Sequence, residues 1–358
     1  MLPRVHKGRG ATSNPAGRFE RFAREAFDDG WSSLAELAAD PAPTTQVLPD
    51  RARSIIAYNR SPDIPFDRSL NPYRGCEHGC IYCYARPSHT HLGLSAGLDF
   101  ETRIFVKADA AALLRQELAR PGYGCRPIAL GANTDPYQPL ERRLRVTRQI
   151  LEVLAEARHP IGIVTKSALV TRDIDVLRLL ARDGLARVYL SVTTLDPRLA
   201  RTLEPRAAAP HRRLEAIRAL TAAGIATGVM VAPIIPALTD HEIEPILDAA
   251  ATAGAASAGY VLLRLPHEVK DLFRAWLDGH HPARAAHVLS LVRQCRDGRL
   301  NDPGFGSRMR GDGVYARLIA ERFAKARARH GLDRRQLPQR TDLFRPPRPD
   351  GQLDLFGA

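Results

Sequence analysis

Three of the five cysteines of this chain lie close together, as Cys76, Cys80 and Cys83. Thiols at this spacing can fold over one metal centre, because Gly75 and Gly79 let the backbone between them bend. Three thiolates are one ligand short of the four that close an ordinary iron–sulfur or zinc site. The cysteine string therefore predicts a metal centre with one position open to a small molecule, and the rest of the chain has to fold around it.

A zinc site is the alternative interpretation of the same string. His78, His89 or His91 could supply a fourth ligand, and the chain would then be a zinc-stabilised nucleic-acid-binding protein without catalysis. The spacing of the cysteines favours the iron–sulfur centre. Cys125 and Cys295 stand alone in other segments, so they predict no disulfide.

The net charge of +13 favours a polyanionic partner. Only five of the 52 basic residues are lysines, as GC-rich coding would produce. Base composition can exchange lysine for arginine, but it does not by itself create a surplus of cations over anions. The charge therefore indicates a nucleic-acid partner, and a purely solubilising charge is the alternative.

The sequence contains no run of 18 or more apolar residues and does not begin with the pattern of a signal peptide. Clustered thiols that hold a metal also suit a reducing compartment. We therefore expect a cytoplasmic protein that does not bind a membrane.

After the cysteines, apolar strands alternate with amphipathic helices. This alternation predicts βαβ units and a parallel sheet, so the expected fold class is α/β. The strand that enters the cysteine loop is the first of six, and the expected later strands are 127–131, 161–165, 188–192, 225–232 and 260–263. In such folds, binding sites gather at the carboxyl ends of the strands.

The loop after the strand at 127–131 is rich in polar residues and contains Asn133 and Thr134. A single helix cap would explain one of these polar residues, but it does not explain all of them together. The pattern favours a loop that binds a ligand.

Three other polar residues lie at the carboxyl ends of later strands. Lys166 suits a carboxylate ligand as a point charge, although its ammonium group could simply reach solvent. Ser191 could bind a ribose or carboxylate, or cap a turn. Arg264 could face a substrate phosphate or pair with Glu268.

Four strings occur together in this order: the cysteine string and the segments 132–135, 165–167 and 233–236. The ensemble resembles the spore-photoproduct-lyase-like branch of the radical SAM superfamily, often labelled DNA repair photolyases. The resemblance covers roughly residues 50–330. It implies a partial (β/α)6 barrel, a [4Fe–4S] cluster, S-adenosylmethionine (SAM) and an electron donor of the flavodoxin or ferredoxin type.

Composition and the resemblance together divide the chain into four parts, because the segments before and after the barrel are rich in Arg and Pro. An N-terminal extension is expected before the barrel, with C-terminal helices and a disordered tail after it. The expected parts are 1–53 for the extension, 54–280 for the barrel, 281–332 for the helices and 333–358 for the tail.

The roles of individual residues follow from the resemblance. The cluster ligands correspond to the three clustered cysteines. Tyr82 matches the residue beside the adenine of SAM, and it forms with Tyr84 the tyrosine pair that takes part in hydrogen-atom return. The expected cofactor-binding residues are Tyr82, Asn133, Thr134, Lys166 and Ser191.

The implied activity is the reductive cleavage of SAM to a 5′-deoxyadenosyl radical, which abstracts a hydrogen atom from the substrate. Damaged DNA is the expected substrate, in a lyase-like repair reaction, and RNA, a peptide or a metabolite are the alternatives. One residue departs from the lyase pattern. Asn133 stands where the lyase has a cysteine that donates a hydrogen atom, and an asparagine cannot do this. Repair of spore photoproduct itself is therefore not expected.

The end of the chain carries apolar residues in an otherwise Arg- and Pro-rich tail. The string Gln352, Leu353, Asp354, Leu355 and Phe356 resembles the pentapeptide by which bacterial repair proteins dock on the DNA polymerase sliding clamp. Leu355 and Phe356 would fill an apolar pocket, with the tail as a tether. The alternative is that the terminus folds back on its own barrel.

Overall fold

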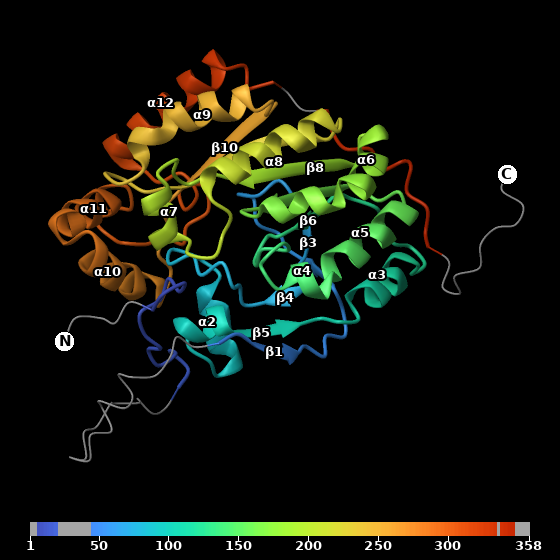
Figure 1. Cartoon of the computed structure of the whole chain (residues 1–358), viewed down its shortest axis with the longest axis horizontal. Helices are drawn as coiled ribbons and strands as arrows, with labels where there is room; N and C mark the ends of the chain where they lie inside the picture. Colours follow the sequence, from blue (N-terminus) through green and yellow to red (C-terminus); the bar gives the residue numbers. More distant parts are fainter. Residues whose placement is uncertain (1–5, 21–43, 335–336, 348–358) are drawn as a thin grey trace, which may run out of the picture.

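The main sheet of the computed structural model is open and has seven strands, in the order β10-β9-β8-β7-β6-β3-β2 (Figure 1). The structure describes residues 6–20, 44–334 and 337–347. Six neighbouring strands are parallel, and only β2 runs antiparallel, at the edge beside β3. The strands are β2 (Ile56–Tyr58), β3 (Arg68–Leu70), β6 (Ile128–Leu130), β7 (Ile161–Thr165), β8 (Ala186–Ser191), β9 (Ala226–Ile234) and β10 (Ser257–Leu262).

Helices follow the strands and cover the outside of the sheet, so the predicted partial (β/α)6 arrangement is confirmed (Figure 1). Among the described residues no strand pairs β10 with β2, so the sheet stays open there. The helices that follow its strands are α3 (Ala110–Leu118), α4 (Glu141–Leu144), α5 (Val146–Glu156), α6 (Ile174–Arg182), α7 (Pro197–Leu203), α8 (Pro210–Ala222), α9 (Ile243–Thr252) and α10 (Val269–His280). After these come α11 (Pro282–Gln294) and α12 (Gly313–Arg329).

Short elements complete the chain. A second, small sheet has the order β1-β5-β4 and lies beside α2 (Figure 1). The 3-10 helices are η1 (Arg86–Leu92), η2 (Ala168–Asp173) and η3 (Asp240–Glu242). The remaining elements are β1 (Gln46–Pro49), β4 (Tyr73–Arg74), β5 (Arg103–Val106) and α2 (Leu98–Thr102).

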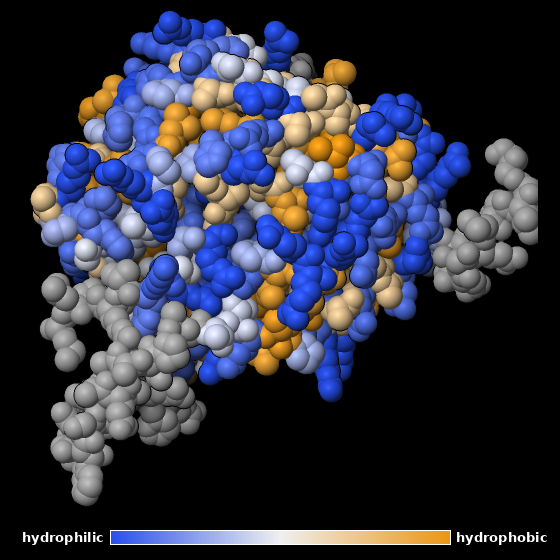
Figure 2. All heavy atoms as spheres, viewed as in Figure 1, coloured by the Kyte–Doolittle hydropathy of each residue, from blue (hydrophilic) through white to orange (hydrophobic). Residues whose placement is uncertain are grey.

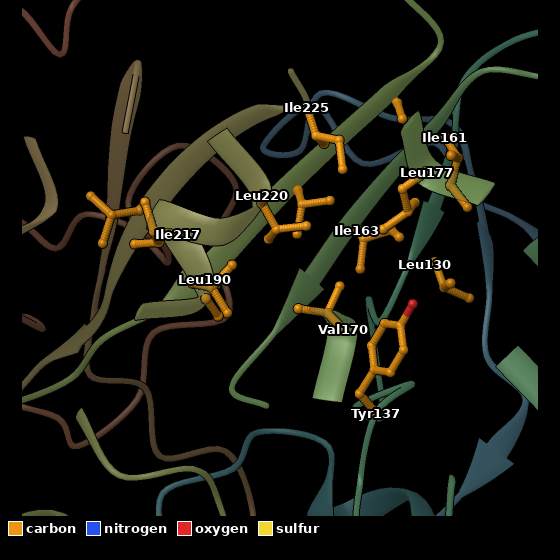
Figure 3. Packing of buried hydrophobic residues seen from close by; sticks show 14 of the residues in the cluster. Leu130, Tyr137, Ile161, Ile163, Val170, Leu177, Leu190, Ile217, Leu220 and Ile225 are labelled. Carbon is orange, nitrogen blue, oxygen red and sulfur yellow. The ribbon is translucent and has the colours of Figure 1, made fainter. Parts of the chain in front are cut away.

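The core lies between the sheet and its helices (Figure 3). Ile161 and Ile163 alternate along β7 and are fully buried, as the period of a strand requires. Leu177 on α6 and Leu220 on α8 are also buried, within the same cluster as these strand residues. Each such side chain contributes about 1.5–3 kcal/mol by leaving water, so this packing fixes where the strands end.

The open edge of the sheet is bridged by the segment between α11 and α12. The N–H of Gly306 donates to Asp63 at 2.7 Å, and the guanidinium of Arg308 pairs with the same carboxylate. On the other side of the gap, the N–H of Leu262 donates to the carbonyl of Met309 at 2.9 Å. This segment therefore connects β10 with the hairpin loop between β2 and β3.

The predicted disorder of the tail is wrong for residues 337–347. The amide of Gln339 donates to the carbonyls of Ile161 and Leu185, at 2.8 and 2.7 Å. The ring of Phe344 lies 5.4 Å from that of Tyr123 and 5.5 Å from that of His159. These contacts satisfy main-chain groups at the amino end of β7 and partly bury an aromatic ring, which the Arg- and Pro-rich composition does not reveal.

Other expectations remain predictions. The clamp motif, residues 352–356, lies outside the described residues. The boundaries 1–53, 54–280, 281–332 and 333–358 are not tested. None of the helices in the described ranges combines the length and apolar character that crossing a bilayer requires.

We predict that Phe344→Ala lowers the free energy of unfolding by about 1.5–3 kcal/mol, because it removes a large part of a packed aromatic side chain. Leu337→Ala is the matched control in the same segment, since Leu337 is 82% exposed, and its effect should stay within about 0.5 kcal/mol. Urea unfolding of both variants measures the difference. Equal stability of the two variants would show that the segment does not pack in solution.

Candidate active site

The cysteine loop leaves β4 through two glycines with left-handed backbones. Gly75 has φ +82° and Gly79 has φ +67°. A Cβ at Gly75 would lie 2.9 Å from the carbonyl oxygen of Phe100, and one at Gly79 would lie 2.7 Å from Glu101. Both positions therefore need glycine, as the sequence indicated.

A buried ion pair between Arg86 and Glu101 supports this loop. Arg86 is fully buried and donates to the carbonyls of Gly79 and Cys80, at 3.1 and 2.9 Å, while it pairs with Glu101. The same Glu101 carboxylate accepts hydrogen bonds from the N–H groups of residues 10 and 11, at 3.0 and 2.8 Å. The N-terminal segment therefore packs directly on the cysteine loop.

All five cysteines lie in the described ranges and are free thiols. Cys76 and Cys80 are buried and Cys83 is partly exposed. Burial raises the pKa of the Cys76 and Cys80 thiols, so a bound metal centre has to stabilise their thiolates in place of water.

Each histidine that could complete a zinc site has another partner. His78 Nδ1 lies 3.3 Å from a carboxylate oxygen of Asp135, and the ring of His91 lies 4.9 Å from that of Phe19. His89 Nε2 lies 2.9 Å from the carbonyl of Arg103, and burial lowers the pKa of His89. Among the described residues no histidine groups with the cysteines as the ligands of one ion do, which leaves the three thiols as the donor set.

This donor set fits a four-iron cluster with one open iron. Within the described ranges, no three His, Cys, Asp or Glu side chains converge as the ligands of a single ion do. In a [4Fe–4S] cube each cysteine binds a different iron, so the three thiols need not converge on one point.

Asp135 joins the cysteine loop to the end of β7. Its carboxylate accepts hydrogen bonds from the Thr165 hydroxyl and the Lys166 N–H, both at 2.7 Å, and faces His78. Burial opposes ionisation, yet the nearby His78 ring and these hydrogen bonds lower the pKa of Asp135. An ionised Asp135 thus fixes the position of Lys166.

Asn133 and Thr134 are neighbours in the loop after β6, but their side chains have different surroundings. The N–H groups of Asn133 and Thr134 both donate to the Asn71 side chain, at 2.9 and 3.3 Å. The Thr134 hydroxyl is buried and donates to the carbonyl of Tyr73 at 2.9 Å, so it serves the fold. Asn133 is exposed at the carboxyl end of β6.

Glu204 is the central residue that the sequence analysis missed. Its buried carboxylate accepts hydrogen bonds from Tyr82, Arg213 and Thr193, the last at 2.7 Å, and lies 3.3 Å from Lys166 Nζ. Burial opposes its ionisation, but Arg213 and Lys166 hold the pKa of Glu204 far below its usual range. One signal was available in the sequence: Arg213 occupies a core-facing position of α8, where a cation needs a buried carboxylate.

Lys166 is held at the ends of three strands. Its Nζ donates to the Ala232 carbonyl at 2.9 Å and to the Thr193 hydroxyl at 3.2 Å, and it lies 5.6 Å from the centre of the Tyr82 ring. Ser191 is buried nearby, and its carbonyl accepts a hydrogen bond from Arg213 at 2.8 Å. The structure therefore brings together Tyr82, Lys166 and Ser191, three of the predicted cofactor residues.

The two tyrosines beside Cys83 point to different parts of the site. Tyr82 is buried and reaches Glu204, whereas Tyr84 is 49% exposed as a residue. The hydroxyl of Tyr84 donates to the carbonyl of Ala132, beside Asn133. Tyr84 therefore spans the mouth of the site, from the cysteine loop to the loop after β6.

Known proteins share much of this sequence. The sequence model of the Radical SAM superfamily matches residues 70–250. An uncharacterised protein of Mycobacterium tuberculosis is 36% identical over 293 residues, which are 80% of this chain and 82% of that protein. A radical SAM Nα-GlyT isomerase of Pseudomonas phage M6 is 26% identical over 175 residues, which are 48% of this chain and 34% of the isomerase.

Solved structures show the same fold. Spore photoproduct lyase complexed with dinucleoside spore photoproduct superposes with a TM-score of 0.57 and 17% identity, over 79% of this chain and 78% of the lyase. At this identity the likeness is one of fold. The matched family segment contains the cysteine loop and the ends of β6 to β9, where the site residues meet. The chain belongs to the radical SAM superfamily and is an enzyme that uses a [4Fe–4S] cluster and SAM.

Proposed function

We propose that this radical SAM enzyme acts on damaged DNA in a lyase-like reaction that begins with hydrogen abstraction. The placement of Tyr84 carries the proposal, because a half-exposed aromatic ring beside the cysteine loop offers a surface on which a base can stack. The net charge of +13 suits a DNA partner, and hydrophilic side chains cover much of the face in Figure 2. The fold of a lyase solved with a dinucleoside photoproduct gives further support.

Cys76, Cys80 and Cys83 would hold the cluster and leave one iron for SAM. When bound, the cluster and SAM would supply the one-electron reductive cleavage of SAM to methionine and a 5′-deoxyadenosyl radical, and we propose a flavodoxin or ferredoxin as the external electron donor. Arg86 and Glu101, which support the loop, are fully buried and so hold its main chain away from water.

Lys166 would bind the SAM carboxylate and Tyr82 would lie beside the adenine, with Ser191 nearby. In the structure Lys166 is engaged by Glu204, but the Glu204 carboxylate has a second cation in Arg213. Lys166 can therefore turn toward a ligand without leaving Glu204 uncompensated.

Tyr84 and Asn133 would face the substrate. Since an asparagine cannot return a hydrogen atom as a thiol does, we propose a DNA lesion or modified base other than spore photoproduct. An RNA, peptide or metabolite substrate is the competing prediction.

We predict that the anaerobically purified protein is brown and carries four irons per chain, the content of a [4Fe–4S] cluster. Replacing Cys76, Cys80 or Cys83 by Ala should abolish the visible absorbance and SAM cleavage. Cys125→Ala, which removes a thiol outside the loop, should change neither. Stoichiometric zinc in place of iron after reconstitution would contradict the assignment.

For Lys166 we predict that Lys166→Met weakens SAM binding by about 1.5–3 kcal/mol, the range for a charged hydrogen bond, and leaves the cluster absorbance intact. Lys270→Met, at an exposed position on α10, is the control. Equilibrium binding of labelled SAM measures the effect. An unchanged affinity in Lys166→Met would mean that Lys166 serves only as a partner of Glu204.

The substrate is tested with reconstituted enzyme, reductant and SAM. We expect irradiated duplex DNA to stimulate 5′-deoxyadenosine formation above the level without DNA, because the radical then finds a hydrogen to abstract. Tyr84→Ala should lose this stimulation, while Tyr58→Ala, an exposed tyrosine elsewhere, should keep it.

Two results would count against the proposal. Stimulation by RNA or a peptide but not by any DNA would overturn the DNA substrate. Clean conversion of a synthetic dinucleoside spore photoproduct to two thymines would show that a hydrogen donor other than the residue at position 133 exists.

A further inference from the structure

A second cation, Arg264, lies at the mouth of the site, two residues after the end of β10. Its Cζ is 5.7 Å from the centre of the Tyr84 ring, and its Nη1 donates to the Met309 sulfur at 3.4 Å, a weak acceptor. The buried Nε has no hydrogen-bond partner within the described part of the chain. The guanidinium is therefore only partly satisfied by protein groups.

Arg264 also lacks a carboxylate partner at ion-pair distance among the described residues. Glu268, four residues on, pairs instead with Arg18 at 3.1 Å. Two acidic residues near Arg264 are also engaged: Asp63, in the loop between β2 and β3, pairs with Arg308, and Asp302, in the bridging segment, accepts a hydrogen bond from the Gly304 N–H at 2.8 Å.

This position is unfavourable for an isolated cation. Burial and the neighbouring Arg308 both lower the pKa of Arg264. A half-buried guanidinium without a counter-charge is costly, and a bound anion would offset that cost. Lys166, by contrast, already has a carboxylate partner in Glu204.

We infer that Arg264 binds a phosphodiester group of the DNA substrate, an inference that rests on the proposed function. A base stacked on the exposed part of Tyr84 would bring its own backbone to the rim where Arg264 lies. The planar guanidinium presents a fork of N–H donors that matches two phosphate oxygens.

SAM is the other possible source of an anion, through its carboxylate. The cation placed for that group is Lys166, which lies at the end of β7 and contacts the ends of β8 and β9. Arg264 follows β10, at the far edge of the sheet. Its contacts are with Tyr84 and Met309, on the open side of the site. We therefore infer that the anion bound by Arg264 belongs to the substrate.

The test uses the full-length protein with its cluster and a labelled DNA duplex, in anaerobic anisotropy titrations at several salt concentrations. Arg264→Gln should weaken DNA binding about tenfold and reduce the steepness of log K against log salt by about 0.9, the value for one lost phosphate contact. Arg264→Lys keeps the charge and should keep the slope. SAM affinity should be the same in all three proteins.

Arg340→Gln is the matched control, because Arg340 pairs with Asp342 at 2.6 Å in the segment that packs at the amino end of the strands. This variant should bind DNA as the unaltered protein does. Cluster absorbance and thermal unfolding check that Arg264→Gln is folded, and Arg264→Lys provides the comparison if it is not.

Failure of the proposed function and failure of this inference give different results. If the unaltered protein binds no DNA, the proposed function has failed and this inference falls with it. If that protein binds DNA and Arg264→Gln shows the same slope, only the inference is wrong. A loss of SAM affinity with unchanged DNA binding would assign Arg264 to the SAM carboxylate and also overturn it.

Discussion

The buried ion pair of Arg86 and Glu101 is the interaction on which the site depends. Taking both charges out of water is costly, and the pair is favourable only because almost every donor and acceptor finds a partner. Arg86 uses its N–H groups on carbonyls of the cysteine loop, and Glu101 uses its oxygens on the N-terminal segment. The loop is thus held by its main chain, which leaves the three thiols available. Loss of either charge would leave the other buried alone, so the loop would lose its support.

The two cations of the site differ in how their charge is compensated. Lys166 belongs to a buried network in which the Glu204 carboxylate is shared with Arg213. That network holds the ends of β7, β8 and β9 in fixed relation, and it can tolerate the departure of one cation. Arg264 has no carboxylate at ion-pair distance within the described residues, and its buried Nε has no hydrogen-bond partner there, which is why we infer that it binds an anion. A site for a resident cofactor and a site for a transient substrate would be expected to differ in this way.

Much of the fold could be predicted from the sequence, because buried parallel strands read as apolar runs and helices as periodic ones. The strand at 161–165 was predicted to the residue, and the cysteine loop gave the position of the site. Glu204 could not be found in this way, since its role depends on long-range partners and its own segment has no distinctive pattern. The packing of Phe344 was hidden for a similar reason: one aromatic ring and one glutamine anchor a segment whose composition is otherwise typical of disorder.

The segment that bridges the open edge of the sheet also contacts Arg264, on the substrate side of the site. A partial barrel leaves the edge of β10 without a neighbouring strand, and exposed edges have to be covered. Here the segment between α11 and α12 covers it, through the hydrogen bond from Leu262 to Met309 and the ion pair of Arg308 with Asp63. The same segment brings Met309 against Arg264 and Arg308 close enough to repel it. The segment that bridges the edge of the sheet therefore also forms part of the surroundings of Arg264, the residue that we infer binds a phosphate.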